Sequence, residues 1–156
     1  YGQLDWTLRN DPRVIVMERT NIRYVTKDDV DDIIDFISID VSFISLRLVL
    51  PIAKMLLSRG GSIMALIKPQ FEAGRDKVGK KGIVRSKKTH IEVIKSMVKL
   101  CKDQGLKIVD LDFSPITGGT GNIEFLTYIL KSDDLVEIND TKIIETVNNA
   151  HESLKG

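Results

Sequence analysis

Apolar positions along this chain alternate between short continuous runs and longer repeats with helical spacing. Runs typical of β-strands cover 14–17, 33–39, 62–67, 106–113 and 123–130. Helical spacing covers 45–57, 88–104 and 141–154. Gly60-Gly61 and Gly105 are expected to end the first two helices, and Pro51 means that the first either begins near it or kinks there. Strands alternating with helices predict a mainly parallel α/β sheet covered by helices.

Composition limits the possible classes of protein. With 156 residues, 42% of them apolar and 29% charged, the chain has the size and balance of one soluble globular domain. The net charge of +1 indicates no particular partner, and no apolar run reaches the roughly 18 to 20 residues of a membrane helix. Cys101 is the only cysteine, which excludes an internal disulfide and fits a reducing cytoplasm, where we expect the protein to act. No spacing of residues suggests a metal site.

Three polar residues stand where apolar runs end and loops begin. Asp40 follows the run 33–39, Lys68 follows 62–67, and Glu124 lies at the start of 123–130. Ligands of open α/β sheets bind outside the ends of the strands, so these side chains are candidates for chemistry. The alternative is structural: Asp40 caps a helix, and Lys68 and Glu124 form surface ion pairs.

Two loops have unusual compositions. Residues 75–88 hold seven basic residues and one acid, a local charge of +6, and glycines interrupt them. Such a loop suits phosphate contacts with nucleic acid, although a solvated loop is the plainer interpretation. The candidate RNA contacts are Arg75, Lys77, Lys80, Lys81 and Arg85. The glycine-rich loop 114–122 could hold a phosphate or make a tight hairpin, and it lacks the lysine of a P-loop.

Five segments together resemble a known family. They are YGQLDW at 1–6, ERTNIR at 18–23, DVSFISL at 40–46, LIKPQFEAG at 66–74 and GNIEFL at 121–126. This set resembles the hemolysin A-like proteins of the FtsJ-like group, which are S-adenosylmethionine-dependent ribosomal RNA 2'-O-ribose methyltransferases. The resemblance implies a Rossmann-like class I methyltransferase sheet with helices on both faces. It also implies that 1–156 is the C-terminal portion of that domain, without its N-terminal strands, the glycine-rich cofactor turn or an RNA-binding module.

The resemblance also implies catalytic roles. The family has a Lys-Asp-Lys-Glu set, in which Asp40, Lys68 and Glu124 match the last three members and the first lysine has no counterpart here. Lys68 is expected at the 2'-hydroxyl, either as an electrostatic anchor or as a base. Asp40 is expected to orient Lys68 and to face the cofactor, and Glu124 to support the hydrogen-bond network.

The cofactor implied is S-adenosylmethionine, and the implied partner is ribosomal RNA or a ribosomal subunit. The candidate contacts of the cofactor are Gln3, Leu4, Glu18, Asn21 and Asp40, although Glu18 and Asn21 could equally be exposed loop residues. Because the glycine-rich turn is missing, we expect these residues alone to bind the cofactor weakly and to be inactive.

Two other classes of function stay open at this point. One is a non-catalytic RNA-binding protein on a methyltransferase fold, and the other is a membrane-active hemolysin. Among the remaining residues, His90 and His151 are expected on the surface, Cys101 in the core, and Trp6 packed near the start of the domain.

Overall fold

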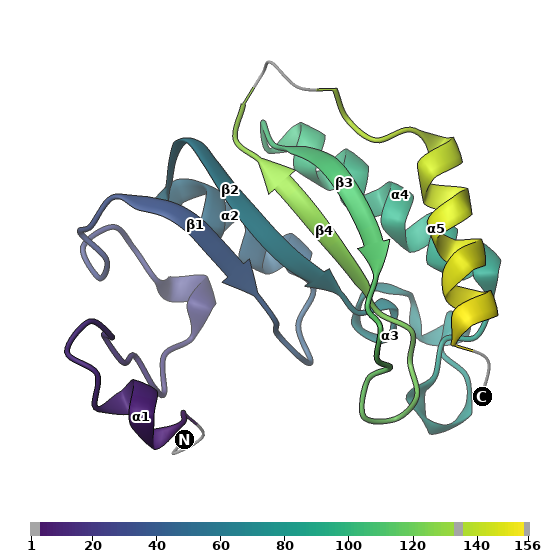
Figure 1. Ribbon diagram of the computed structural model, residues 1–156, viewed down its shortest axis with the longest axis horizontal. Coiled ribbons are helices and arrows are strands. Elements are labelled where there is room, and N and C mark those ends of the chain that lie inside the picture. Colours follow the sequence, from purple (N-terminus) through teal and green to yellow (C-terminus); the bar gives the residue numbers. More distant parts are fainter. Residues whose placement is uncertain (1–3, 133–135, 155–156) are drawn as a thin grey trace.

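Four β-strands form one sheet, with helices packed against it (Figure 1). The computed structural model describes residues 4–132 and 136–154, so Gln3 lies outside the described residues. The strands are β1 (Ile34–Ile39), β2 (Leu57–Ile67), β3 (Lys107–Phe113) and β4 (Phe125–Leu130). Their order in the sheet is β1-β2-β4-β3.

The sheet is less parallel than the sequence suggested. β1 and β2 are parallel, but β4 lies between β2 and β3 and is antiparallel to both. The expectation of a mainly parallel sheet is therefore wrong for two of the three strand pairs. The cause is the connection 114–124, which is too short for the helical crossover of about a dozen or more residues that parallel neighbours need. The glycine-rich loop consequently makes a hairpin.

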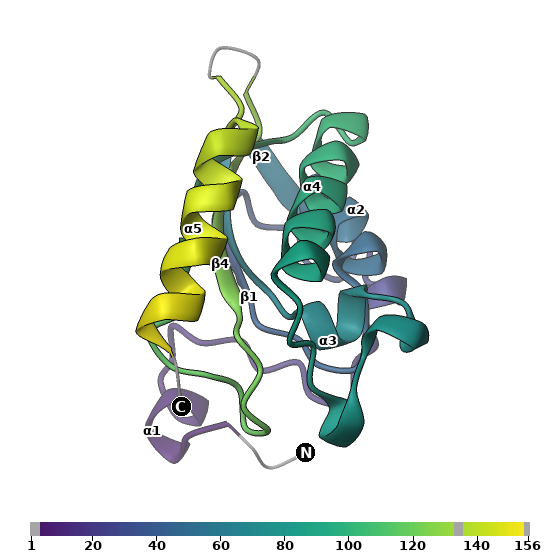
Figure 2. The same ribbon diagram turned by 90° about the vertical axis from the view of Figure 1, so that its right-hand side faces the viewer.

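Three longer helices flank the sheet, which agrees with the predicted fold class. They are α2 (Leu46–Leu56), α4 (Lys87–Asp103) and α5 (Asp140–Ser153). Helices α2 and α4 lie on one side of the strands (Figure 2), and α5 packs against α4 and the edge strand β3. The short helices are α1 (Trp6–Arg9) and α3 (Pro69–Glu72), with single 3-10 turns at η1 (Ile22–Tyr24), η2 (Arg75–Lys77) and η3 (Lys80–Gly82).

The core forms on the inner face of the two central strands. Alternate residues of β2 and β4 are buried in it, as the period of two in a strand requires: Ile63, Ala65, Ile67, Phe125, Thr127 and Ile129. Cys101 on α4 lies in this core as predicted, and burial raises the pKa of its thiol to about 12. A thiol with so high a pKa is unreactive at neutral pH.

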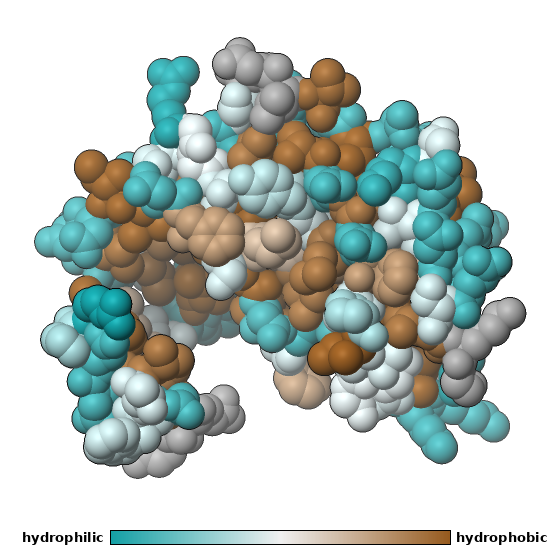
Figure 3. Space-filling view, in the orientation of Figure 1, coloured by the Kyte–Doolittle hydropathy of each residue, from teal (hydrophilic) through white to brown (hydrophobic). Residues whose placement is uncertain are grey.

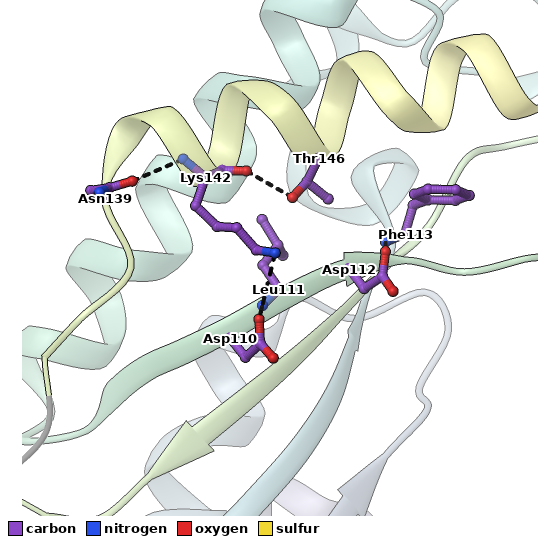
Figure 4. A network of polar contacts seen from close by, with 7 residues as sticks. All are labelled: Asp110, Leu111, Asp112, Phe113, Asn139, Lys142 and Thr146. Carbon is purple, nitrogen blue, oxygen red and sulfur yellow. Dashed lines mark hydrogen bonds and ion pairs between the residues drawn. The ribbon is translucent and has the colours of Figure 1, made fainter.

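Polar contacts hold α5 in place beside β3 (Figure 4). Asn139 caps the helix by accepting a hydrogen bond from the Lys142 backbone N–H at 2.9 Å. Lys142 Nζ lies 3.8 Å from Asp110 Oδ1 on β3, and Thr146 Oγ1 donates to the Lys142 carbonyl at 2.7 Å. The N-terminal half of α5 is thus fixed against the edge of the sheet.

Local signals misled the sequence interpretation at three places. Residues 14–17 form no strand, because a strand needs a pairing partner. This segment belongs to the N-terminal lobe, residues 4–33, and lies away from the described sheet (Figure 1). Helix α2 continues through Pro51 and ends at Leu56, so Gly60-Gly61 lie within β2 instead of ending the helix. Trp6 is 76% exposed and does not pack into the domain.

The two histidines are partners instead of isolated surface residues. His90 is fully buried; its Nε2–H donates to the Val84 carbonyl at 3.0 Å, which leaves Nδ1 to accept from His151 Nε2–H at 2.8 Å. The expectation that both lie on the surface is wrong for His90. Its place on the buried face of α4, with Val93, Ile94 and Met97, was the signal in the sequence.

Acid should weaken the fold through His90. Burial, with His151 nearby, lowers the pKa of His90 from 6.5 to about 4, so the unfolded chain binds this proton first as pH falls. The unfolding free energy should therefore drop between pH 6.5 and 4, with about 3 kcal/mol from this group. Urea titrations at stepped pH should give His90→Gln a shallower slope over that range, whereas equal slopes would contradict the assignment.

Candidate active site at the strand ends

Asp40 and Lys68 meet where the two parallel strands end. Asp40 follows β1 and Lys68 follows β2, and Lys68 Nζ lies 2.7 Å from Asp40 Oδ1. The ammonium also donates to Ser42 Oγ at 3.1 Å. The Lys68 side chain is 13% exposed and that of Asp40 72%, so the lysine is largely covered while the carboxylate faces solvent. Asp40 does not cap α2, because Ser45 holds that position.

Glu124 reaches the same edge of the sheet by a different route. The antiparallel register pairs Ile67 with Phe125, so Lys68 and Glu124 are the next residues on the two neighbouring strands. Glu124 is buried, and its Oε2 accepts a hydrogen bond from Gln70 Nε2 at 3.0 Å. The lysine's ion pair is with Asp40, and Glu124 is joined to the same edge through Gln70. Because Glu124 is buried, it does not form the surface ion pair that was the structural alternative.

Gly118 makes room for the Glu124 carboxylate. A Cβ placed at Gly118 would lie 2.7 Å from Glu124 Oε2, closer than a carbon and an oxygen can approach without a shift. The hairpin holds this arrangement, because the Ser114 N–H donates to the Glu124 carbonyl at 2.8 Å and the Gly118 N–H to the Asn122 carbonyl at 2.8 Å. The glycine-rich loop therefore packs closely against the Glu124 carboxylate.

Phe43 lies in the loop between β1 and α2 and was missed by the sequence interpretation. The residue is 89% exposed, its ring centroid is 4.9 Å from that of Phe71, and its φ of +64° is unusual for a residue with a side chain. An exposed ring on strained backbone, next to Ser42 whose hydroxyl holds Lys68, indicates a functional surface. The signal in the sequence was an aromatic residue three positions after the strand-end acid Asp40.

Glu72 fixes the far end of the same loop and was also missed. Its Oε1 accepts from the Leu46 backbone N–H at 2.7 Å and its Oε2 from Ser45 Oγ at 2.7 Å, both at the N-terminus of α2. Burial raises the pKa of Glu72, and the hydrogen bonds from Leu46 and Ser45 oppose that change. The carboxylate compensates for the N–H groups that open every helix.

The basic loop lies beside this edge and is fastened to it. All five candidate RNA contacts are exposed, and Lys77 Nζ lies 3.1 Å from Glu92 Oε2 on α4. Asn122 is fully buried; its Oδ1 accepts from the Val84 N–H at 2.9 Å and its Nδ2 donates to the Gly82 carbonyl at 2.8 Å. One amide thus ties the basic loop to the segment that carries Glu124 and leads into β4.

An apolar groove of about 390 Å³ runs along the outer side of β1. It is lined by β1, by α2 and by residues of the 22–30 segment, and Ser38 and Asp40 supply polar groups at one end. Figure 3 shows apolar surface in the recess between the N-terminal lobe and β1. Asp40 therefore stands between this groove and Lys68.

The remaining predicted cofactor contacts, Leu4, Glu18 and Asn21, are not among the residues that line the groove. Glu18 forms an ion pair with Arg9 of α1, and the Asn21 side chain accepts from the Arg23 N–H at 3.0 Å as the cap of η1. Ile22, next to Asn21, does line the groove. Leu4 is partly buried in the N-terminal lobe.

Comparison with known proteins identifies the family. Residues 1–131 match the FtsJ-like methyltransferase family. The chain belongs to that family. YqxC of Bacillus subtilis, which is named as an rRNA methyltransferase, is 51% identical to this FtsJ-like chain over 99% of the chain and 57% of its own length. TlyA of Mycobacterium tuberculosis, named as a 16S/23S rRNA (cytidine-2'-O)-methyltransferase, is 39% identical over 86% of this chain and 50% of TlyA.

A solved structure agrees with the fold of this FtsJ-like chain. A hemolysin-named protein from Streptococcus thermophilus superimposes with a TM-score of 0.93 at 46% identity, covering 99% of this chain and 56% of that one. The chain thus spans about half the length of the relatives that it matches. The described residues include neither a helix long and apolar enough to cross a membrane nor a group of three metal-binding side chains.

Gly118 should not tolerate a methyl group. In Gly118→Ala the new Cβ would collide with Glu124 Oε2, and such overpacking should lower the unfolding free energy by about 1–3 kcal/mol. Gly119→Ala is the matched control, because a Cβ there meets nothing within 4 Å, and its effect should stay within about 0.5 kcal/mol. Urea unfolding measures both variants, and equal stabilities would show that Glu124 is not held against Gly118.

Proposed function

We propose that this FtsJ-like chain is the catalytic part of an S-adenosylmethionine-dependent methyltransferase that modifies 2'-hydroxyls of ribosomal RNA. The observation that carries the proposal is the largely covered Lys68 ammonium, held 2.7 Å from the exposed Asp40 at the strand ends. The names of its relatives support the substrate, because TlyA is named for methylation of cytidine 2'-oxygens in rRNA.

The chemistry explains why a lysine is useful here. A ribose 2'-hydroxyl is a weak nucleophile, and its oxygen becomes more negative as it attacks a methyl group. An ammonium positioned at that oxygen stabilises the charge, and a fixed position is worth more than a mobile one. The ion pair with Asp40 and the hydrogen bond to Ser42 hold Nζ in place. We therefore assign Lys68 the role of electrostatic anchor.

The groove beside β1 suits a nucleoside-containing cofactor. Its volume is in the range of small-molecule sites, its walls are apolar, and the Asp40 carboxylate lies at one end. We assign Ile22, Ser38 and Asp40 to the cofactor side, with Leu4, Glu18 and Asn21 as the further candidates from the sequence. S-adenosylmethionine, when bound, supplies an activated methyl group, and a position next to Asp40 would bring that group toward Lys68.

The surface around Lys68 suits RNA. The basic loop offers five exposed cations for phosphate groups, and Asn122 holds this loop beside the segment that carries Glu124. The exposed ring of Phe43 offers a face on which a base can stack. We propose that Glu124, buried against Gln70, supports the residues beneath this surface through hydrogen bonds and does not contact the RNA.

Removing the Lys68 ammonium should abolish most methyl transfer. In the complete protein, Lys68→Ala should slow single-turnover 2'-O-methylation of ribosomal RNA by about 10²–10⁴-fold, because the developing charge loses its anchor. RNA affinity should change little, since the basic loop is untouched. Lys99→Ala, an exposed lysine on α4, is the control. Normal turnover in Lys68→Ala would rule out the assignment.

Removing two charges from the basic loop should change the salt dependence of RNA binding. If Lys80 and Lys81 each contact a phosphate, the double variant Lys80→Gln/Lys81→Gln should reduce the slope of log affinity against log salt by about 1.4–1.8. The control is Lys99→Gln/Lys102→Gln, which removes the same charge from α4. Filter binding or fluorescence anisotropy with ribosomal RNA gives both slopes, and identical slopes would place the RNA elsewhere.

A further inference from the structure

A single helical turn, α3, contacts each of the segments that carry the proposed catalytic residues. It begins directly after Lys68, its Gln70 reaches Glu124, and its Glu72 reaches the end of the loop that starts at Asp40. We propose that α3 is a positioning element, in which Gln70 fixes the Glu124 carboxylate and Glu72 fixes the Asp40 loop relative to Lys68.

The turn itself is well defined. Pro69 occupies its first position, where the fixed φ of proline suits a helix start. The Phe71 N–H donates to the Lys68 carbonyl at 2.9 Å, and the Ala73 N–H donates to the Pro69 carbonyl at 2.9 Å. Lys68 and Glu72 are therefore held at opposite ends of one closed turn, and displacing Glu72 should displace Lys68 as well.

Glu72 and Lys68 hold the two ends of the Asp40 loop. Lys68 binds its beginning, through Asp40 and Ser42, and Glu72 binds its end, through Ser45 Oγ and the Leu46 N–H. Between these contacts the rings of Phe43 and Phe71 pack with centroids 4.9 Å apart. The loop and the turn thus run alongside each other, with contacts in the same order along both segments.

Gln70 acts on the other acid. Its Nε2 donates to Glu124 Oε2 at 3.0 Å, and this bond sets the orientation of the amide. Its Oε1 is buried without a hydrogen-bond partner among the described residues. A buried amide oxygen without a partner costs about 1–3 kcal/mol, so Gln70 is poorly explained by stability alone. Holding Glu124 in one orientation explains why a glutamine stands there.

Glu72 carries a similar cost. Glu72 is a partly buried carboxylate. Burial raises its pKa, which means that the fold disfavours the charged form. An apolar residue at this position would avoid that cost but would release Ser45 and Leu46. The turn α3 therefore contains two residues, Gln70 and Glu72, whose burial costs stability and whose contacts hold neighbouring groups in position.

The test compares Glu72→Ala, which removes both hydrogen bonds, with Glu72→Gln, which can accept from the Leu46 N–H and donate to Ser45 Oγ. Crystal structures of the complete protein should show the Lys68 Nζ–Asp40 Oδ1 distance beyond 4 Å in Glu72→Ala and close to its original 2.7 Å in Glu72→Gln. Glu145→Ala, an exposed glutamate on α5, is the matched control and should leave the distance unchanged.

The kinetic part of the inference rests on the proposed function. Glu72→Ala should lower kcat for rRNA methylation by about 10–100-fold with little change in KM for RNA, and Glu72→Gln should restore most of kcat. If the unsubstituted protein methylates no rRNA, the proposed function fails while the measured distance still decides the positioning role.

Two results would overturn the inference. One is an intact Lys68–Asp40 pair in Glu72→Ala, and the other is a broken pair with unchanged kcat. If Glu72→Ala does not fold, Ser45→Ala removes one of the two contacts of Glu72 and should lengthen the distance and lower kcat in the same direction. An unchanged distance and kcat in Ser45→Ala would then count against the proposal.

Discussion

The ion pair between Lys68 and Asp40 joins the ends of two parallel strands, and the arrangement of the strand-end edge depends on it. Parallel neighbours bring their ends to the same side of a sheet, so a lysine and an acid placed directly after β2 and β1 must lie close together. The antiparallel β4 starts at that edge and adds Glu124. Strand direction thus brings together residues that are far apart in the sequence.

Several features of this edge reduce stability. Phe43 has a left-handed backbone, Gln70 Oε1 has no partner among the described residues, Glu72 is a partly buried carboxylate, and Glu124 is a buried one. The apolar core beneath β2 and β4 offsets these costs, because it packs against α2 and α4 and holds the ends of both strands. The separation between a stable core and a costly edge is what a preorganised site requires.

Sequence reasoning predicted the parts that depend on local pattern. The strand ends at Asp40 and Lys68 follow from apolar runs, and the family resemblance is confirmed by the match over residues 1–131. The antiparallel direction of β4 was left open, because the alternation of strands and helices favoured a parallel sheet while the glycine-rich loop 114–122 allowed a hairpin. The roles of Glu72, Asn122 and His90 were missed for a related reason: their partners lie 26, 38 and 61 residues away, and no local pattern shows such contacts.

The most direct test of the account is a crystal structure of the complete protein bound to S-adenosylhomocysteine and an RNA strand that carries the target nucleotide. We predict that the 2'-oxygen of that nucleotide lies within hydrogen-bond reach of Lys68 Nζ, at about 3 Å, while Asp40 remains paired with the lysine. A 2'-oxygen bound at another face of the sheet, or one whose nearest cation is a different residue, would contradict the account.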